Sequence, residues 1–75
     1  MTLADMKDGE VCSILNVLSK KDLKRRLFDL GFFPGMQVEC VIRSPFESPI
    51  LFKVNGALIA LRAIDAKEIE VIHEK

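Results

Sequence analysis

The clearest hydrophobic pattern lies in residues 50–61, where two apolar runs flank Asn55-Gly56. An Asn-Gly pair in this setting is typical of a two-residue type I′ hairpin, because both central residues of that turn need a positive φ. The turn fixes the strand register and therefore the residues that share a face. We expect the core face to carry the pairs Val54–Ala57, Phe52–Ile59 and Ile50–Leu61. The opposite face then carries Leu51, Lys53, Leu58 and Ala60.

Three further segments have the composition or alternation of strands. Residues 10–17 are rich in Val, Ile and Leu, which favours a first strand. Residues 37–43 alternate, so that one face is expected to hold Val38, Cys40 and Ile42. Residues 68–72 predict a last strand with Ile69 and Val71 directed inward.

One helix is predicted between the first and second of these strands. Leu23, Leu27 and Leu30 recur at i, i+4 and i+7, which indicates a single apolar stripe. Ser19 is the expected N-cap, with Asp22 three residues later as an acidic variant of the capping box. Gly31 suits the left-handed residue that closes a helix, and the Pro34-Gly35 turn stops it from continuing.

These elements predict one small, mainly β domain over residues 1–75. Residues 44–49 form a loop, since Pro45 and Pro49 would break strand pairing. Residues 62–67 are expected to form a short turn or 3₁₀ segment. About five short antiparallel strands around so small a core must curl to shield their edges. We therefore expect an SH3-like β-barrel with one α-helix inserted after the first strand.

Composition narrows the class of protein. Eleven basic and eleven acidic residues cancel, which gives no support to binding of nucleic acid by bulk charge. The chain also lacks Tyr and Trp for base stacking. The N-terminal residues do not resemble a signal peptide, and no run approaches the ~20 apolar residues of a membrane span. We expect a cytoplasmic protein without membrane insertion.

Reactive side chains are few and scattered. Cys12 and Cys40 lie in predicted strands and are interpreted as core thiols, with a disulfide or metal ligation as alternatives. His73 is interpreted as a solvated side chain, and Glu68 and Glu70 as solubilising carboxylates. No nucleophile lies near a plausible base, and no His/Glu cluster has the spacing of an iron site. We predict no enzymatic activity, no cofactor and no metal ligands.

Landmarks along nearly the whole chain carry a family resemblance. They are Thr2-Leu3-Ala4-Asp5, Gly9-Glu10, the run 26–32 (RLFDLGF) with Pro34-Gly35, Pro49-Ile50, and Ile59-Ala60-Leu61-Arg62 before Ala66. In their order and spacing the chain resembles FeoA, the small cytoplasmic component of bacterial ferrous-iron transport. The resemblance implies an SH3-like barrel with a helix after the first strand, and an association with transition-metal transport.

The resemblance also implies a partner. FeoA-like proteins assist a large membrane transporter that has a cytoplasmic GTP-binding domain. One departure is visible: family members often carry Leu-Gly-Asp before the proline that matches Pro49, whereas this chain has Phe46-Glu47-Ser48. We therefore do not transfer any role of this loop from the family to this chain.

The predicted helix offers a candidate docking surface for that partner. On a helical wheel, Phe28 lies away from the leucine stripe, with Lys21, Lys24 and Arg25 as its neighbours. An aromatic residue ringed by cations resembles an interface anchor, and Phe33 extends the surface at the helix exit. The alternative is that Phe28 packs under the N-terminal segment or a barrel edge, beside an ordinary solvated face of lysines.

The off-core face of the hairpin is the second candidate surface. We expect the helix or residues 1–9 to cover it; if uncovered, it could support weak self-association or strand addition by a partner peptide. For the whole chain, the favoured hypothesis is a non-enzymatic accessory that docks on a ferrous-iron transporter. The alternative is a regulatory module related to the C-terminal SH3-like domain of metal-dependent repressors, although this chain lacks their DNA-binding half.

Overall fold

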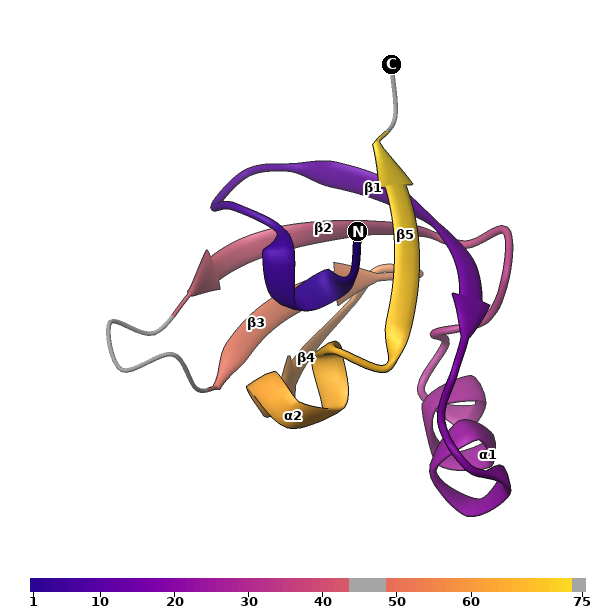
Figure 1. Cartoon of the computed structure of the whole chain (residues 1–75). Coiled ribbons are helices and arrows are strands. Elements are labelled where there is room, and N and C mark those ends of the chain that lie inside the picture. The colour runs from indigo at the N-terminus through magenta and orange to yellow at the C-terminus, as the bar shows by residue number, and fades with distance from the viewer. Residues whose placement is uncertain (44–48, 74–75) are drawn as a thin grey trace.

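A five-stranded antiparallel sheet is the framework of the protein, in a computed structural model that describes residues 1–43 and 49–73. The strand order is β4-β3-β2-β1-β5, so consecutive strands are neighbours except where β5 returns to pair with β1 (Figure 1). The strands are β1 (Val11–Val17), β2 (Gln37–Arg43), β3 (Ile50–Val54), β4 (Ala57–Leu61) and β5 (Ile69–His73). The loop predicted over residues 44–49, with the altered Phe46-Glu47-Ser48, lies outside the described residues except for Pro49.

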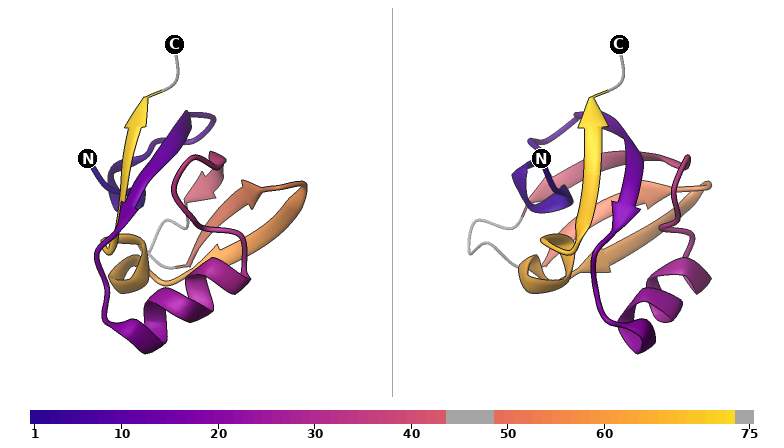
Figure 2. Two further views of the ribbon diagram at one scale, coloured as in Figure 1. Left: turned by 90° about the vertical axis from the view of Figure 1, so that its right-hand side faces the viewer. Right: turned by 45° about the vertical axis from the view of Figure 1, so that its right-hand side comes forward.

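The sheet curls around a single apolar core. Figure 2 shows β1 and β5 on one side of the core and β3 and β4 on the other, which gives a partly open barrel. Phe32 and Phe52 are fully buried at its centre, with their rings edge to face at 6.3 Å between centroids. The mainly β architecture with one inserted helix is therefore as the sequence predicts.

The β3–β4 hairpin has the predicted register. Val54 pairs with Ala57, Phe52 with Ile59 and Ile50 with Leu61, and Asn55 has the positive φ (51°) that a type I′ turn needs. The β3 members of these pairs are buried. On β4 only Leu61 is buried, whereas Ala57 beside the turn is exposed.

The prediction for β2 is wrong at its end. Val38 and Cys40 are buried as expected, but Ile42 is 54% exposed. A register shift between Cys40 and Ile42 inserts one extra residue against β3, and such a bulge reverses the inward and outward alternation beyond it. Ile42 therefore joins the outer face of the sheet, opposite Leu51.

Two details of the helix differ from the prediction. The helix α1 spans Lys21–Asp29, and its N-cap is Lys20 without a side-chain hydrogen bond. Ser19 lies too early to cap it, and its Oγ is buried with no hydrogen-bond partner among residues 1–43 and 49–73. Leu27 is buried and Leu23 packs against the core, but Leu30 is exposed because it is the C-cap, where the chain already turns away.

The N-terminal segment closes one side of the barrel. Leu3–Asp5 forms a 3₁₀ turn, η1, with a capping box between Thr2 and Asp5. Leu3 and Met6 are fully buried. Arg43 holds this segment through Nη1, which donates to the carbonyls of Ala4 (2.6 Å) and Met6 (2.9 Å).

The short helix α2 (Ala63–Ala66) connects β4 to β5, where the sequence predicts a turn or 3₁₀ segment. Ala66 is buried and faces the core beside Ile69 and Val71, the inward residues predicted for the last strand. Cys12 and Cys40 are both fully buried thiols that form no disulfide, as their interpretation as core residues requires.

Candidate functional site

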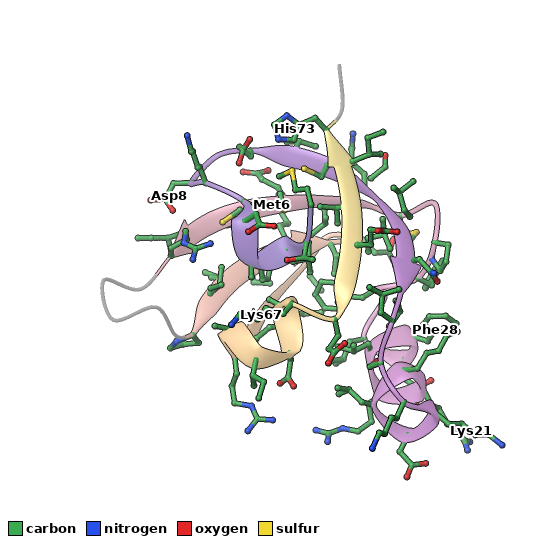
Figure 3. All side chains as sticks on the ribbon, in the orientation of Figure 1. Met6, Asp8, Lys21, Phe28, Lys67 and His73 are labelled. Carbon is green, nitrogen blue, oxygen red and sulfur yellow. The ribbon has the colours of Figure 1, made fainter. Side chains whose placement is uncertain are left out.

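The candidate docking surface lies on the side of α1 that faces away from the barrel. Lys21 and Phe28 both project from this side of the helix (Figure 3). Leu27, the next residue along the chain from Phe28, is 1% exposed and points to the core. The position of Phe28 outside the core therefore follows from the helical period of the leucine stripe.

The end of α1 positions the second aromatic residue. Gly31 has φ of 106° and its N–H donates to the Phe28 carbonyl (3.0 Å), while the Phe32 N–H donates to the Leu27 carbonyl (2.9 Å). These two bonds define a Schellman motif, which reverses the chain direction. Phe32 then enters the core, and Phe33 remains at the surface.

The following turn is fixed to the sheet. The Met36 N–H donates to the Phe33 carbonyl (3.1 Å), and Gly35 has φ of 92°, as a type II turn with proline at its second position requires. The Gly35 N–H also donates to the carbonyl of Ile14 in β1 (2.8 Å). Phe33 is therefore held by backbone hydrogen bonds on both sides.

Phe28 and Phe33 form an aromatic pair at the surface. Their ring centroids are 6.4 Å apart with an interplanar angle of 70°, an edge-to-face arrangement. Phe28 is 36% exposed and Phe33 39%. Lys24 Nζ lies 5.7 Å from the Phe28 ring centroid, within the range of a cation–π contact. Lys21 and Arg25 are exposed on the same helix.

This arrangement has the features of a binding surface. An apolar pair of rigid rings beside cations provides desolvation at the centre and charge at the edge, as interface hot spots do. Together, Lys21, Lys24, Arg25, Phe28 and Phe33 define what we call the α1 surface. The docking role of this surface stays a prediction.

The remaining titratable groups do not assemble a metal centre. Within residues 1–43 and 49–73, no three His, Cys, Asp or Glu side chains come close enough to hold a metal ion. His73 is not simply solvated, because its Nε2 lies 2.8 Å from Glu10 Oε2. Burial, aided by the negative charge of Asp8, raises the pKa of the Cys40 thiol above its ordinary value.

The helices of the described chain are all too short or too polar to cross a membrane.

The outer face of the hairpin differs from the expectation that another segment covers it. Leu58 is 63% exposed and Ala60 is exposed, so neither α1 nor residues 1–9 cover this face. The sequence could not show this, because coverage depends on where distant segments pack.

The fold defines a class: a small barrel of antiparallel strands, with one helix inserted between its first two strands. The family model described as the FeoA domain matches residues 1–73. A candidate Fe(2+) transport protein A of Campylobacter jejuni is 34% identical over 71 residues, which cover 95% of this chain and 96% of that protein. The chain therefore belongs to the FeoA domain family.

A second curated relative has a different organisation. It is a Porphyromonas gingivalis fusion of Fe(2+) transport protein A with the Fe(2+) transporter FeoB. Identity is 27% over 71 residues, and the match spans 95% of this chain but only 8% of the fusion protein. In that organism, the FeoA-like part and the transporter are one polypeptide.

Solved structures agree with the architecture. The iron(II) transport protein A of Clostridium thermocellum has a TM-score of 0.93 and 32% identity, covering 97% of this chain and 45% of that one. The FeoA of Stenotrophomonas maltophilia, solved in complex with zinc and described as an SH3 domain protein, has a TM-score of 0.85 and 30% identity, covering 96% and 89%. The SH3-like class is thus confirmed.

The alternative family is visible at the level of fold alone. A manganese-dependent transcriptional repressor matches with a TM-score of 0.89 and 17% identity over 99% of this chain and 41% of its own. At this identity the similarity shows a shared architecture and carries no function.

Proposed function

We propose that this protein is a non-enzymatic accessory of ferrous-iron uptake in the cytoplasm, and that its α1 surface docks on the cytoplasmic GTP-binding domain of a FeoB-type transporter. The observation that carries the proposal is the exposed pair Phe28–Phe33 with Lys24 against the Phe28 ring. Two phenyl rings held in place at a surface are ready to fill a pocket, because little side-chain freedom remains to be lost.

The distribution of charge supports an acidic partner surface. Residues 20–29 contain five basic and two acidic residues, although the chain as a whole is neutral. Positive charge is therefore concentrated on the helix that carries Phe28. Such a patch speeds the encounter with an acidic surface, and the effect weakens as salt screens it.

The family relationship supports the identity of the partner. In the Porphyromonas gingivalis relative, fusion holds the FeoA-like part and the FeoB part together at all times. When the two parts are on different polypeptides, a binding surface is needed to bring them together. The α1 surface lies at one end of the barrel, where a partner can approach without displacing a strand (Figure 1).

The direct test measures the Kd between this protein and the transporter's isolated cytoplasmic GTP-binding domain, with GTP analogue and with GDP. The variant Lys21→Glu/Lys24→Glu reverses two charges of the α1 surface. Its control, Lys7→Glu/Lys67→Glu, changes the net charge equally at two exposed lysines elsewhere. We expect at least tenfold weaker binding for the first variant and less than twofold change for the control.

Equal weakening by both variants would show that binding depends on net charge and not on the α1 surface. Absence of binding by the wild-type protein in both nucleotide states would contradict the choice of partner domain.

A further inference from the structure

The outer face of the β2–β3–β4 sheet is a surface that the proposed function leaves unused. Cross-strand register sets its side chains in two rows: Ile42–Leu51–Ala60 and Glu39–Lys53–Leu58. The first row is apolar, and Leu58 extends it into the second. Neighbours in a row have Cβ atoms about 4.5–5.5 Å apart, so the apolar side chains are contiguous.

This face is open to solvent. Ile42 and Leu58 are each more than half exposed, and Ala60 is exposed as well. The bulge in β2 creates the patch, since without it Ile42 would point into the core. An exposed apolar row in a small monomer is costly unless something covers it.

The charges beside the apolar row identify what could cover it. Glu39 and Lys53 lie opposite each other on neighbouring strands, at one end of the patch. Neither side chain takes part in an ion pair with any residue of the described ranges 1–43 and 49–73. A site for an acidic or a basic partner would show one sign of charge, whereas this face shows one of each.

A face that carries both signs next to an apolar patch is complementary to itself. If two copies meet face to face about a two-fold axis that runs between β2 and β3, Lys53 of each can lie against Glu39 of the other, and Ile42 of each against Leu51 of the other. We propose that the outer face of β2, β3 and β4 is a weak homodimer interface between two copies of this chain. This face shares no residue with the α1 surface.

The test uses this protein alone, so its outcome is independent of the proposed docking on the transporter. Sedimentation equilibrium between 10 μM and 1 mM follows the average mass. We expect it to rise from the monomer value of 8.4 kDa towards twice that value. A mass that stays at the monomer value at 1 mM would overturn the proposal.

Charge reversal tests the arrangement of the interface. Lys53→Glu and Glu39→Lys each bring like charges together across the axis, and each is expected to weaken dimerisation about fivefold or more. The double variant Lys53→Glu/Glu39→Lys restores opposite charges and is expected to dimerise within about twofold of the wild type. A double variant as weak as the two single variants together would refute the proposed pairing.

A matched pair of apolar substitutions locates the interface. Leu58→Ser is expected to weaken dimerisation at least tenfold. Ile64 is 66% exposed on α2, away from this face, and Ile64→Ser should leave dimerisation unchanged. Both side chains are at the surface, so both variants should fold, which amide NMR spectra would show. Dimerisation lost only with Ile64→Ser, or unaffected by Leu58→Ser, would place the interface elsewhere and overturn the proposal.

Discussion

Replacing Phe28 with Ala is the sharpest perturbation of the α1 surface, because it removes the ring that both Phe33 and Lys24 contact. About 36% of its surface is exposed in the free protein. For a residue of roughly 200 Å², this leaves about 70 Å² for a partner to cover. At about 25 cal/mol per Å², covering that area stabilises the complex by about 2 kcal/mol. Its loss corresponds to a roughly 25-fold higher Kd.

The cost to the fold should be smaller than the total stability. Phe28→Ala removes an edge-to-face contact with Phe33 and a surface cation–π contact with Lys24. Together these contribute about 1–2 kcal/mol, and the roughly 130 Å² of the residue that is already covered contributes up to about 3 kcal/mol more, at about 25 cal/mol per Å². Their sum stays below or at the low end of a typical total of about 5–15 kcal/mol. We expect a Tm lower by roughly 15 °C or more, and the amide NMR fingerprint at 25 °C checks that the variant is folded.

Calorimetric titration with the cytoplasmic GTP-binding domain measures the Kd, with Ile64→Ala as the control. Ile64 is exposed on α2 and is not part of the α1 surface. The reasoning fails if folded Phe28→Ala binds within twofold of the wild type, or if the control weakens binding as much.

Three further changes test the fold that supports the surface. Gly31→Ala places a Cβ at φ of 106°, and its backbone strain should lower the free energy of unfolding by about 1 kcal/mol or more in urea titrations. Arg43→Met removes the hydrogen bonds to the Ala4 and Met6 carbonyls and should cost about 2 kcal/mol, with faster amide exchange in residues 1–6. Burial raises the pKa of the Cys40 thiol, so its contribution to stability should be intact below the ordinary value of 9.0 and decrease as the pH rises further. Urea midpoints should therefore fall as the pH is raised above 9.0.

Each of these has its own control. Gly9→Ala also introduces a Cβ at positive φ, but away from the helix end, so it should leave the α1 resonances unchanged. Lys53→Met removes a charge from a side chain without a hydrogen bond or ion pair within the described part of the chain. If Lys53→Met lowers the free energy of unfolding as much as Arg43→Met does, the hydrogen bonds of Arg43 are not the cause of the loss. In Cys40→Val the part of the fall in urea midpoint at high pH that is due to this thiol should be absent. If the midpoint falls as much as in the wild type, other groups cause the fall.

Local signals in the sequence were sufficient for the hairpin and the helix end. Asn55-Gly56 determines its turn through backbone conformation alone, and the register of β3 and β4 follows from it. Gly31 determines the end of α1 in the same way. Both are short-range effects that do not depend on the rest of the fold.

Features that depend on distant packing could not be predicted. The bulge before Ile42 has no glycine or other local mark, and it reflects how β2 must bend to keep pairing with β3. The capping box of Thr2 and Asp5 was a visible signal for the N-terminal turn, but burial of Leu3 and Met6 beneath Arg43 is a tertiary effect. Exposure of the outer hairpin face depends likewise on where α1 packs.

The predictability of the candidate surface follows the same division. Phe28 could be placed outside the core from the helical period of Leu23 and Leu27. Its contact with Phe33 could not, since it requires the Schellman motif and the type II turn to bring Phe33 back beside the helix. The link between Glu10 and His73 was also missed, because it joins the two ends of the chain.

The central claim is that the α1 surface contacts the transporter's cytoplasmic domain, and amide NMR tests it most directly. The ¹⁵N-labelled protein would be titrated with the GTP-binding domain in the nucleotide-free, GDP and GTP-analogue states. The account predicts shifts that cluster in residues 21–33 in at least one state, with β5 little affected. Shifts confined to other segments, or none in any nucleotide state, would contradict it.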